Sequence, residues 1–502
     1  MAAAHSILLK NATILVPQGP GDDTIVPINH HSLLVEGNKI ARIAAHIDPP
    51  SESTEVIDCT SKIVSPGFID THHHVWQTQL KGRHADHSLL EYMAPVSGNM
   101  ASHSYKPEDV FWGQLGGCLE ALEAGTTTLV DHAHVAYSPE HNNAALAGII
   151  SSGIRSIFCY CPTARVKTWK PFALEESILP NWLFEQLDTL CKASPFSDGL
   201  VTMGFAFDLF FLPKEVVVDI YNKVRALDVK TITTHYVRSL SDSSTVDLLE
   251  SYGLLDKDIL LSHATPLNDS DAQKLEKAGA AISSTPDTEL QMGHGWPVCF
   301  QDNAKSISSL GIDCHSNNTG SIVAQMRVGL QAERARRNGH IHESGKFPTK
   351  VGVSVQEAFQ LGTIRGAKAI HMSDQLGSLE EGKIADILVW DALSPGMICA
   401  AQEDPIGAII LHSSPADIET VIVNGQFKKR DGRITSTKLD LQLFPELKPN
   451  KSEVEWREVA LELLKSRDRI LEADKASGAD DTDAAYENGL GLFGIDKEML
   501  AA

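Results

Sequence analysis

Five residues in the middle of the chain have the types and positions that a metal centre needs. His72 and His74 stand two apart at the end of the strand-like segment GFIDTHHH, so strand alternation places both side chains on one face. Three more polar residues each end another strand-like segment: His235 in KTITTHYV, His263 in DILLSHAT and Asp313 in SLGIDCHS. Imidazole and carboxylate groups are the ligands that Zn²⁺ prefers, with Fe²⁺ next. If the strand ends meet, these residues predict a site for one divalent ion.

The residues from Pro66 to about His371 predict the elements that would bring these strand ends together. Strand-like and helix-like segments alternate here, and eight such alternations are what a (β/α)₈ TIM barrel requires. In a barrel the carboxyl ends of the strands converge on one face, where active sites lie. One helix is well marked, because Asn268 or Ser270 can cap its start and Gly279 can end it. A doubly wound open sheet is the main alternative, although no GxGxxG motif follows the first strand.

Short alternating runs at both ends of the chain predict a second, smaller unit. Residues 1–65 and 375–435 have the pattern of antiparallel strands with tight turns, as in EGNKI. We expect these pieces to form one discontinuous β-sandwich domain, with residues 66–374 as the catalytic barrel. Residues 436–502 are expected to be a C-terminal extension that contains an amphipathic helix, SEVEWREVALELLKSRDRILEA, and an acidic segment. Whether this extension packs on the barrel or on a second subunit is left open.

The composition argues against several classes of protein. Of the 502 residues, 42% are hydrophobic and 22% are charged, which is typical of a globular chain rather than a disordered one. A formal net charge of −22 argues against nucleic-acid binding. No stretch has the roughly 18–20 apolar residues needed to span a bilayer, and the eight cysteines show no disulfide framework. We expect a cytoplasmic homo-oligomer that acts on a small molecule and has no nucleic-acid or membrane partner.

Four groups of motifs are similar to segments of a known family. The first strand motif, PGFIDTHHHVWQTQLKG, resembles that of the amidohydrolase superfamily, and its continuation, RHADHSLLEYM, is similar to the cytosine-deaminase and triazine-hydrolase branch. AGTTTLVDHAH resembles the second strand of that branch. GSLEEGKIADILVWD with VIVNGQFKKRDGRI resembles the C-terminal half of its sandwich domain. The resemblance covers about residues 6–435 and implies the same barrel and sandwich.

This resemblance implies a role for each of the five polar residues. Carried over residue by residue, the family pattern makes one ion, Zn²⁺ or alternatively Fe²⁺, the shared partner of His72, His74, His235 and Asp313. His263 would contact the bound water or the substrate, so Asp313 and His263 are the expected catalytic residues. Relatives with two metals carry a carboxylated lysine on the fourth strand, whereas LVTMGFAFDLF contains no lysine. A single ion is therefore expected.

The implied activity is hydrolysis of a carbon–nitrogen bond, other than a peptide bond, in a small cyclic or heteroaromatic compound. Zn²⁺ lowers the pKa of a bound water to about 7, Asp313 would accept the water's proton, and His263 would stabilise the developing negative charge. The same site also fits a lactone or amide hydrolase or a metal-dependent decarboxylase. Outside the enzyme class, the alternative is a catalytically idle barrel that binds a small molecule.

One position departs from the family pattern. The deaminating and dechlorinating relatives usually show HxxE after the fifth strand, whereas this chain has His235, two further residues and then Arg238. A guanidinium cannot act as a general base. We expect Arg238 either to bind a substrate anion bidentately or to be an ordinary surface arginine.

The loops that follow the strands supply further candidates for substrate binding. We expect His73 to point away from the pocket, and His132 and His134 on the second strand to form part of its wall. The remaining expected substrate-binding residues follow the first, seventh and eighth strands: Trp76, Gln77, His294 and His315.

Overall fold

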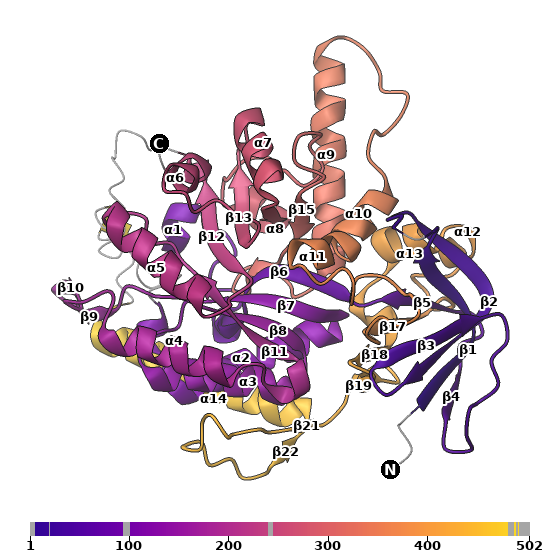
Figure 1. Ribbon diagram of the computed structural model, residues 1–502, viewed down its shortest axis with the longest axis horizontal. Helices are drawn as coiled ribbons and strands as arrows, with labels where there is room; N and C mark the ends of the chain where they lie inside the picture. The colour runs from indigo at the N-terminus through magenta and orange to yellow at the C-terminus, as the bar shows by residue number, and fades with distance from the viewer. Residues whose placement is uncertain are drawn as a thin grey trace.

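The computed structural model describes residues 6–19, 21–93, 101–238, 244–479, 486–487 and 490. It consists of a parallel barrel, a sheet built from both ends of the chain, and a long C-terminal helix that lies along the barrel (Figure 1). This architecture confirms the fold class expected from the sequence. Within the described residues, no helix combines the length and the apolar composition of a membrane-spanning segment.

The barrel is a closed ring of parallel strands. Its last strand is split into two pieces, of which β15 pairs with the seventh strand and β16 pairs with the first, so the ring closes. The strands are buried along most of their length because helices cover the outside. In order around the ring they are β6 (Phe68–His74), β7 (Thr126–Ala133), β8 (Arg155–Tyr160), β11 (Val201–Ala206), β12 (Ile232–Val237), β13 (Ile259–Thr265), β14 (Ala281–Ser284), β15 (Ser308–Leu310) and β16 (Asp313–Cys314).

Helices follow the strands around the barrel. The well-marked helix is α7, in which the Asn268 side chain accepts a hydrogen bond from the Asp271 N–H at the start and Gly279 ends the helix in the left-handed conformation. The helices around the barrel are α2 (Pro107–Glu123), α3 (Pro139–Ser152), α4 (Asn181–Ala193), α5 (Lys214–Ala226), α6 (Thr245–Ser251), α7 (Asp269–Ala278), α8 (Pro286–Gln291), α9 (Ile322–Glu343), α10 (Val355–Leu361) and α11 (Ile364–Ala369).

Shorter elements lie in the connections between the strands and the helices. The connection from β6 to α2 is the longest of them and follows the paired histidines directly. These elements are η1 (Val75–Leu80), α1 (Leu89–Met93), η2 (Ala101–Ser104), the hairpin of β9 (Val166–Trp169) and β10 (Phe172–Leu174), and η3 (Ser197–Gly199).

Strands from both ends of the chain form one nine-stranded sheet, in the order β20-β19-β18-β17-β5-β1-β2-β3, with β4 paired to β1. The antiparallel pairing of β5 with β17 joins the two ends, and β5 leads directly into the first barrel strand. The N-terminal strands are β1 (Ser6–Pro17), β2 (Ile25–Glu36), β3 (Lys39–Ala44), β4 (Glu55–Asp58) and β5 (Lys62–Pro66). The C-terminal part contributes β17 (Ile387–Asp391), α12 (Ala400–Glu403), α13 (Pro405–His412), η5 (Pro415–Asp417), β18 (Ile418–Val423), β19 (Gln426–Arg430) and β20 (Arg433–Ile434).

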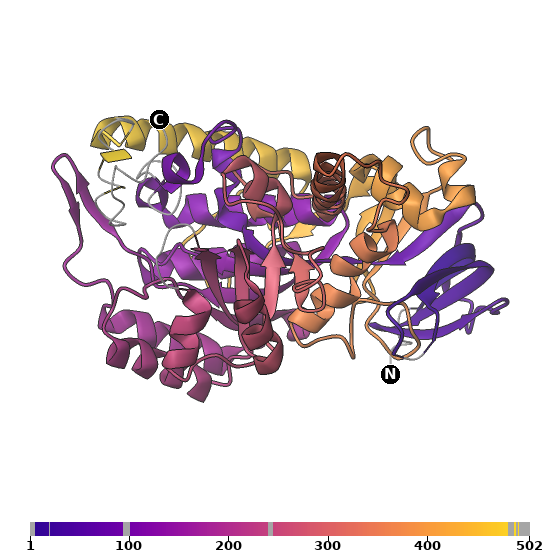
Figure 2. The ribbon, with the colours of Figure 1, turned by 90° about the horizontal axis from the view of Figure 1, so that it is seen from above.

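The C-terminal extension packs on the barrel of its own chain. After β21 (Thr437–Lys438) and β22 (Glu453–Val454), helix α14 (Trp456–Ser477) runs along α2, as Figure 2 shows. Both the Ser466 hydroxyl and the Arg469 guanidinium donate hydrogen bonds to the buried Asp109 of α2. The Gln79 amide donates to Ser466, so the extension also contacts η1, which follows the paired histidines. Most of the predicted acidic segment lies outside the described residues.

A buried ion pair links the barrel to the sheet that is formed by both ends of the chain. Arg155, at the start of β8, donates two hydrogen bonds to Asp386, which precedes β17, at 3.1 and 3.3 Å. Both side chains are about 95% buried, with exposed fractions of 6% and 5%. Asp386 also accepts a hydrogen bond of 2.7 Å from the Asn424 N–H. Removing this carboxylate would leave a buried guanidinium without a counter-charge.

We therefore predict that Asp386→Ala lowers the free energy of unfolding by about 3–5 kcal/mol, as measured by chemical denaturation. Asp48→Ala is the control, because that side chain is 87% exposed and its loss should change stability by less than about 0.5 kcal/mol. An effect of Asp386→Ala as small as that of the control would contradict a stabilising role for this contact.

Candidate metal centre

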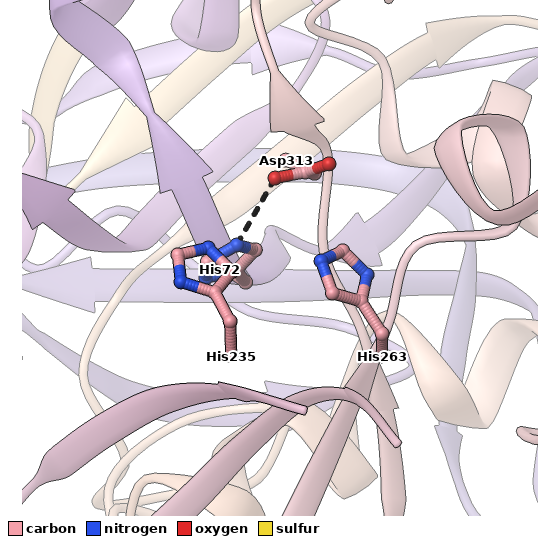
Figure 3. Close-up of side chains that lie close together, drawn as sticks. All are labelled: His72, His235, His263 and Asp313. Carbon is pink, nitrogen blue, oxygen red and sulfur yellow. Dashed lines mark hydrogen bonds and ion pairs between the residues drawn. The ribbon is translucent and has the colours of Figure 1, made fainter. Parts of the chain in front are cut away.

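The five predicted residues converge at the carboxyl ends of the barrel strands. His72 and His74 come from β6, His235 from β12, His263 from β13 and Asp313 from β16. Figure 3 shows His72, His235 and His263 around the Asp313 carboxylate, although their strands are far apart in the sequence. His235 is partly exposed, whereas the other four side chains are at least 97% buried.

Asp313 reaches the paired histidines because the barrel closes next to it. The Ile312 N–H donates a hydrogen bond of 2.9 Å to the His72 carbonyl, and Asp313 lies opposite His73 in the register of β16 and β6. Gly311 permits this close approach, because a Cβ there would lie 2.8 Å from both the Cβ and the carbonyl oxygen of His72.

The backbone is strained at two of the five positions. His263 has φ of 71° and Asp313 has φ of 67°, and Ala264, which follows His263 in β13, has φ of 57°. Side-chain-bearing residues rarely adopt this left-handed conformation, which costs of the order of 1–3 kcal/mol and is concentrated at functional sites. The fold maintains these conformations at the positions whose side chains form the cluster.

The Nε2 atoms of three histidines and one carboxylate oxygen meet at a common point. Asp313 Oδ1 lies 3.1 Å from the Nε2 of His72 and 3.1 Å from the Nε2 of His74. The Nε2 atoms of His74 and His235 are 3.2 Å apart. Ligands of a tetrahedral Zn²⁺ ion, each bound at 2.0–2.1 Å, are about 3.3 Å from one another. These three distances are close to the ligand–ligand spacing of a tetrahedral site.

The other ring nitrogen of each histidine is held by a fixed partner. His74 Nδ1 donates to the His132 carbonyl at 2.9 Å, and His235 Nδ1 donates to Asp208 Oδ2 at 2.9 Å. His72 Nδ1 lies 2.8 Å from the Ser262 hydroxyl. Such contacts fix the tautomer and the orientation of metal-binding histidines.

These tautomers require a positive charge at the meeting point. With Nδ1 protonated, a neutral His74 presents a bare Nε2 lone pair to both the Asp313 carboxylate and the Nε2 of His235. Acceptors that face one another at 3.1–3.2 Å repel unless a cation lies between them. One divalent ion would satisfy all these contacts at once, so the residues fit a metal ion.

The electrostatics of the cluster keep its acidic ligand ionised. Burial alone would raise the pKa of Asp313, but the surrounding imidazoles hold it well below its usual range. Burial lowers the pKa of His72 well below its usual range and keeps it neutral, as a metal ligand must be. Burial would also lower the pKa of His235, but the Asp208 carboxylate raises it overall.

Polar groups surround His263 on the side away from the ligands. Its Nδ1 lies 2.9 Å from the Thr285 hydroxyl and 3.8 Å from Oε1 of the fully buried Glu289. The predicted residue His294 packs edge-on against it, with 4.7 Å between the ring centroids. His294 is 97% buried, and neither ring nitrogen has a hydrogen-bond partner among the described residues.

Trp76 and Gln77 lie in η1, beside the cluster. Trp76 is fully buried, and its indole N–H donates to His134 Nδ1 at 3.1 Å. The Gln77 amide donates to the Tyr92 hydroxyl at 2.7 Å, while its Oε1 is buried without a partner among the described residues. Trp76 thus supports the wall through His134, and Gln77 keeps one acceptor for another molecule.

The structure corrects the expectation for His315. Its Nε2 lies 2.7 Å from the Glu120 carboxylate, and its ring packs against His73 at 4.9 Å, on the side away from the ligands. The left-handed backbone at Asp313 interrupts the strand, so two-residue alternation does not extend to residue 315. His73 itself points away from the ligands, toward Asp70.

Arg238 also lies outside the cluster. Its guanidinium donates a hydrogen bond of 2.9 Å to Asp271 of α7, which also accepts hydrogen bonds from Tyr236 and Ser244. Tyr236 and Arg238 are two residues apart, and both side chains donate to Asp271, whereas the side chain of His235 points to the cluster. This geometry supports the expectation of an ordinary surface arginine over that of an anion-binding group.

Asp208 and Glu289 are site residues that the sequence reasoning missed. Asp208 lies two residues after the end of the apolar strand β11, and it accepts hydrogen bonds from both the backbone N–H and the ring of His235. It also lies 3.1 Å from His132 Nε2, and Cys161 completes a second group of possible ligands. The one available signal was a carboxylate two residues after a buried strand, for Asp208, and in the first helical turn after β14, for Glu289.

The chain is similar in sequence to known proteins. Residues 63–208 and 225–428 match the amidohydrolase family. The 5-methylthioadenosine/S-adenosylhomocysteine deaminase of Pyrococcus abyssi is 26% identical over 444 residues, which cover 86% of this chain and 95% of that enzyme. The 5′-deoxyadenosine deaminase of Methanobrevibacter smithii is 25% identical over 449 residues, which cover 86% and 94%.

Solved structures share the fold. The adenosine deaminase from Xanthomonas campestris with bound zinc has a TM-score of 0.72 and 16% identity, over 93% of this chain and 99% of that one. The atrazine chlorohydrolase from Arthrobacter aurescens complexed with zinc has a TM-score of 0.70 and 19% identity, over 92% and 100%. The family match spans most of the chain and includes all four proposed ligands, so the chain belongs to the amidohydrolase family.

Proposed function

We propose that this protein is a zinc-dependent hydrolase that removes the amino group from an amino-substituted heteroaromatic compound of the adenine-nucleoside type. The observation that carries this proposal is the convergence of three oriented imidazoles and the Asp313 carboxylate on one point. The names of the relatives, which are adenosine-type deaminases, support the reaction and the substrate class. Zinc is proposed over iron because two structural neighbours contain zinc.

We propose that the site holds a single ion. The described fourth strand and its loop offer Asp208 in place of a lysine, and Asp208 is already bonded to the ring of His235. A carboxylate in that position orients the ligand and adds negative charge behind it. This arrangement supports one ion with a fixed ligand set.

The residues of the chain have separate tasks in the reaction. When bound, the divalent ion supplies Lewis acidity, which makes water nucleophilic at neutral pH. The ionised Asp313 carboxylate can accept a proton from the attacking water. His263, opposite the ligands, can transfer a proton or donate a hydrogen bond to the oxygen on which negative charge develops.

The unpaired polar atoms around the cluster favour a neutral ring as substrate. In the described residues they include Gln77 Oε1, His132 Nδ1, His134 Nε2 and both nitrogens of His294. Burial lowers the pKa of His294 to about 3, so this imidazole is neutral and can donate one hydrogen bond and accept another. Nitrogen heterocycles with an exocyclic amine present complementary donors and acceptors.

We also propose a cytoplasmic homo-oligomer without nucleic-acid partners. All eight cysteines are free thiols, which supports a reducing compartment. Trp456, Leu461 and Leu464 on α14 are 44%, 52% and 58% exposed, which supports a contact between subunits there.

Ammonia release by the zinc-loaded protein tests the proposed function. We expect turnover of 5′-methylthioadenosine, S-adenosylhomocysteine or 5′-deoxyadenosine, and loss of that turnover when a chelator removes the ion. Aminotriazines and chlorotriazines form a second panel, because one structural neighbour is an atrazine chlorohydrolase. If the zinc-loaded protein releases ammonia from none of the aminated heterocycles, the proposal is wrong.

Asp313→Asn should lower kcat about 100- to 10,000-fold, because an amide occupies the same space but cannot accept the proton of the attacking water. Steady-state kinetics on the best substrate would measure this effect. Asp48→Asn, an exposed carboxylate far from the cluster, should leave kcat unchanged. Near-native turnover by the Asp313 variant would exclude its role as a base.

His235→Ala should release the metal while the protein stays folded. The imidazole is one of four ligands, and its loss removes both a bond to the ion and the link to Asp208. We expect the zinc content after dialysis to fall from about one ion per chain to less than about one-tenth. His46→Ala, which removes an exposed histidine, should retain the full content. Equal zinc in the two variants would contradict the ligand assignment.

A further inference from the structure

The chain has no glutamate where the HxxE relatives carry one. Arg238 occupies that position and is bonded to Asp271, so it contributes neither a base nor a carboxyl group to the cluster. A second carboxylate nevertheless lies beside the proposed catalytic histidine. Glu289 of α8 is fully buried and places Oε1 3.8 Å from Nδ1 of His263.

Glu289 is held in place by three hydrogen bonds. Its Oε1 accepts from the Thr285 N–H at 2.7 Å, and its two oxygens accept from the Ser284 hydroxyl at 3.2 and 2.9 Å. The Thr285 side chain in turn contacts His263 Nδ1 at 2.9 Å. Among the described residues, His263 is the one basic side chain within ion-pair distance of Glu289. Among the described residues, His263 is therefore the basic group to which the Glu289 carboxylate lies closest.

We propose that Glu289 is a positioning residue that acts through His263. Its charge holds the imidazole as the Nδ1–H tautomer and stabilises the cation that forms when Nε2 takes a proton. His263 can then perform the proton transfer that the glutamate performs in the HxxE relatives. In a Ser-His-Asp triad, the carboxylate likewise fixes the tautomer of the catalytic histidine and stabilises its protonated form. This inference rests on the proposed function.

Hydrolytic deamination needs two proton transfers, so it needs two carriers. The water oxygen forms a bond to the ring carbon, and the carbon–nitrogen bond to the exocyclic amine breaks, with its electron pair leaving on the nitrogen. One proton of the water goes to the ring nitrogen beside that carbon. The other goes to the amine, which leaves as ammonia. Asp313 carries one proton and His263 the other, with no oxidant or reductant involved.

One further observation supports this assignment. The left-handed backbone at His263 stores strain at the residue on which Glu289 acts, as expected where a fold enforces a functional orientation. The competing explanation is structural, because Glu289 also accepts the backbone N–H of Thr285, the residue that precedes α8.

The test compares two variants that each neutralise one carboxylate of α8. Glu289→Gln keeps the size and an acceptor for the Thr285 N–H but removes the charge. Asp287→Asn removes the charge of a neighbouring, partly buried carboxylate for which no contact with His263 is found. The zinc-loaded, full-length proteins are labelled with ¹⁵N-histidine, and His263 is assigned from the spectrum of His263→Asn.

We expect the Nδ1–H signature of His263 in the wild-type protein and in Asp287→Asn, and its loss in Glu289→Gln. We also expect Glu289→Gln to lower kcat about 10- to 100-fold, with unchanged KM and zinc content, and Glu289→Asp to recover part of this loss. An unchanged tautomer or an unchanged kcat in Glu289→Gln would overturn the proposal.

If Glu289→Gln does not fold, a second variant tests whether Glu289 or Thr285 sets the tautomer of His263. Thr285→Val removes the hydroxyl beside Nδ1 but leaves the charge of Glu289. The Nδ1–H tautomer should persist in this variant, and its loss would assign the effect to Thr285 and overturn the role of Glu289. The tautomer is read without any substrate. Lack of turnover by the wild-type enzyme would therefore count against the proposed function and leave this test standing.

Discussion

The pairing of the last barrel strand with the first is the contact on which the proposed centre depends. It places Asp313 opposite His73, so the carboxylate lies beside the two histidines that flank that residue. Asp313 and His72 are 241 residues apart in the sequence, and the closure of the ring is what brings their side chains together. The other ligand, His235, arrives from the fifth strand at the same end of the barrel. The fold thus sets the ligand geometry before any ion binds.

The charges of the site, like its geometry, indicate a bound divalent cation. The pKa values of Asp208 and Asp313 are both held well below their usual range, so two negative charges lie within and directly behind the ligand set. Isolated carboxylates in a largely buried site are costly unless a cation compensates for them. A divalent ion would neutralise both charges, and Asp208 would act on it through the ring of His235. Glu289 extends this pattern to His263 from the opposite side of the site.

The sequence predicted what depends on local pattern and on barrel topology. Period-two alternation placed His72 and His74 together and His73 apart, and strand order brought His235, His263 and Asp313 to the same face. It failed at His315, where a left-handed residue interrupts the strand. The partner of Arg238 is Asp271, 33 residues away, and the partner of Asp208 is His235, 27 residues away. Such pairs depend on how the loops and helices that follow the strands pack over the strand ends, which alternation does not encode.

X-ray absorption spectroscopy of the zinc-loaded protein tests the metal centre most directly, because it reports the ligand atoms around the ion. The geometry requires about three imidazole nitrogens and at least one oxygen at 2.0–2.1 Å from a single zinc. A sulfur at about 2.3 Å would instead place the ion with Cys161 in the neighbouring group of His132 and Asp208. That result, or a second zinc nearby, would contradict a mononuclear site built on His72, His74, His235 and Asp313.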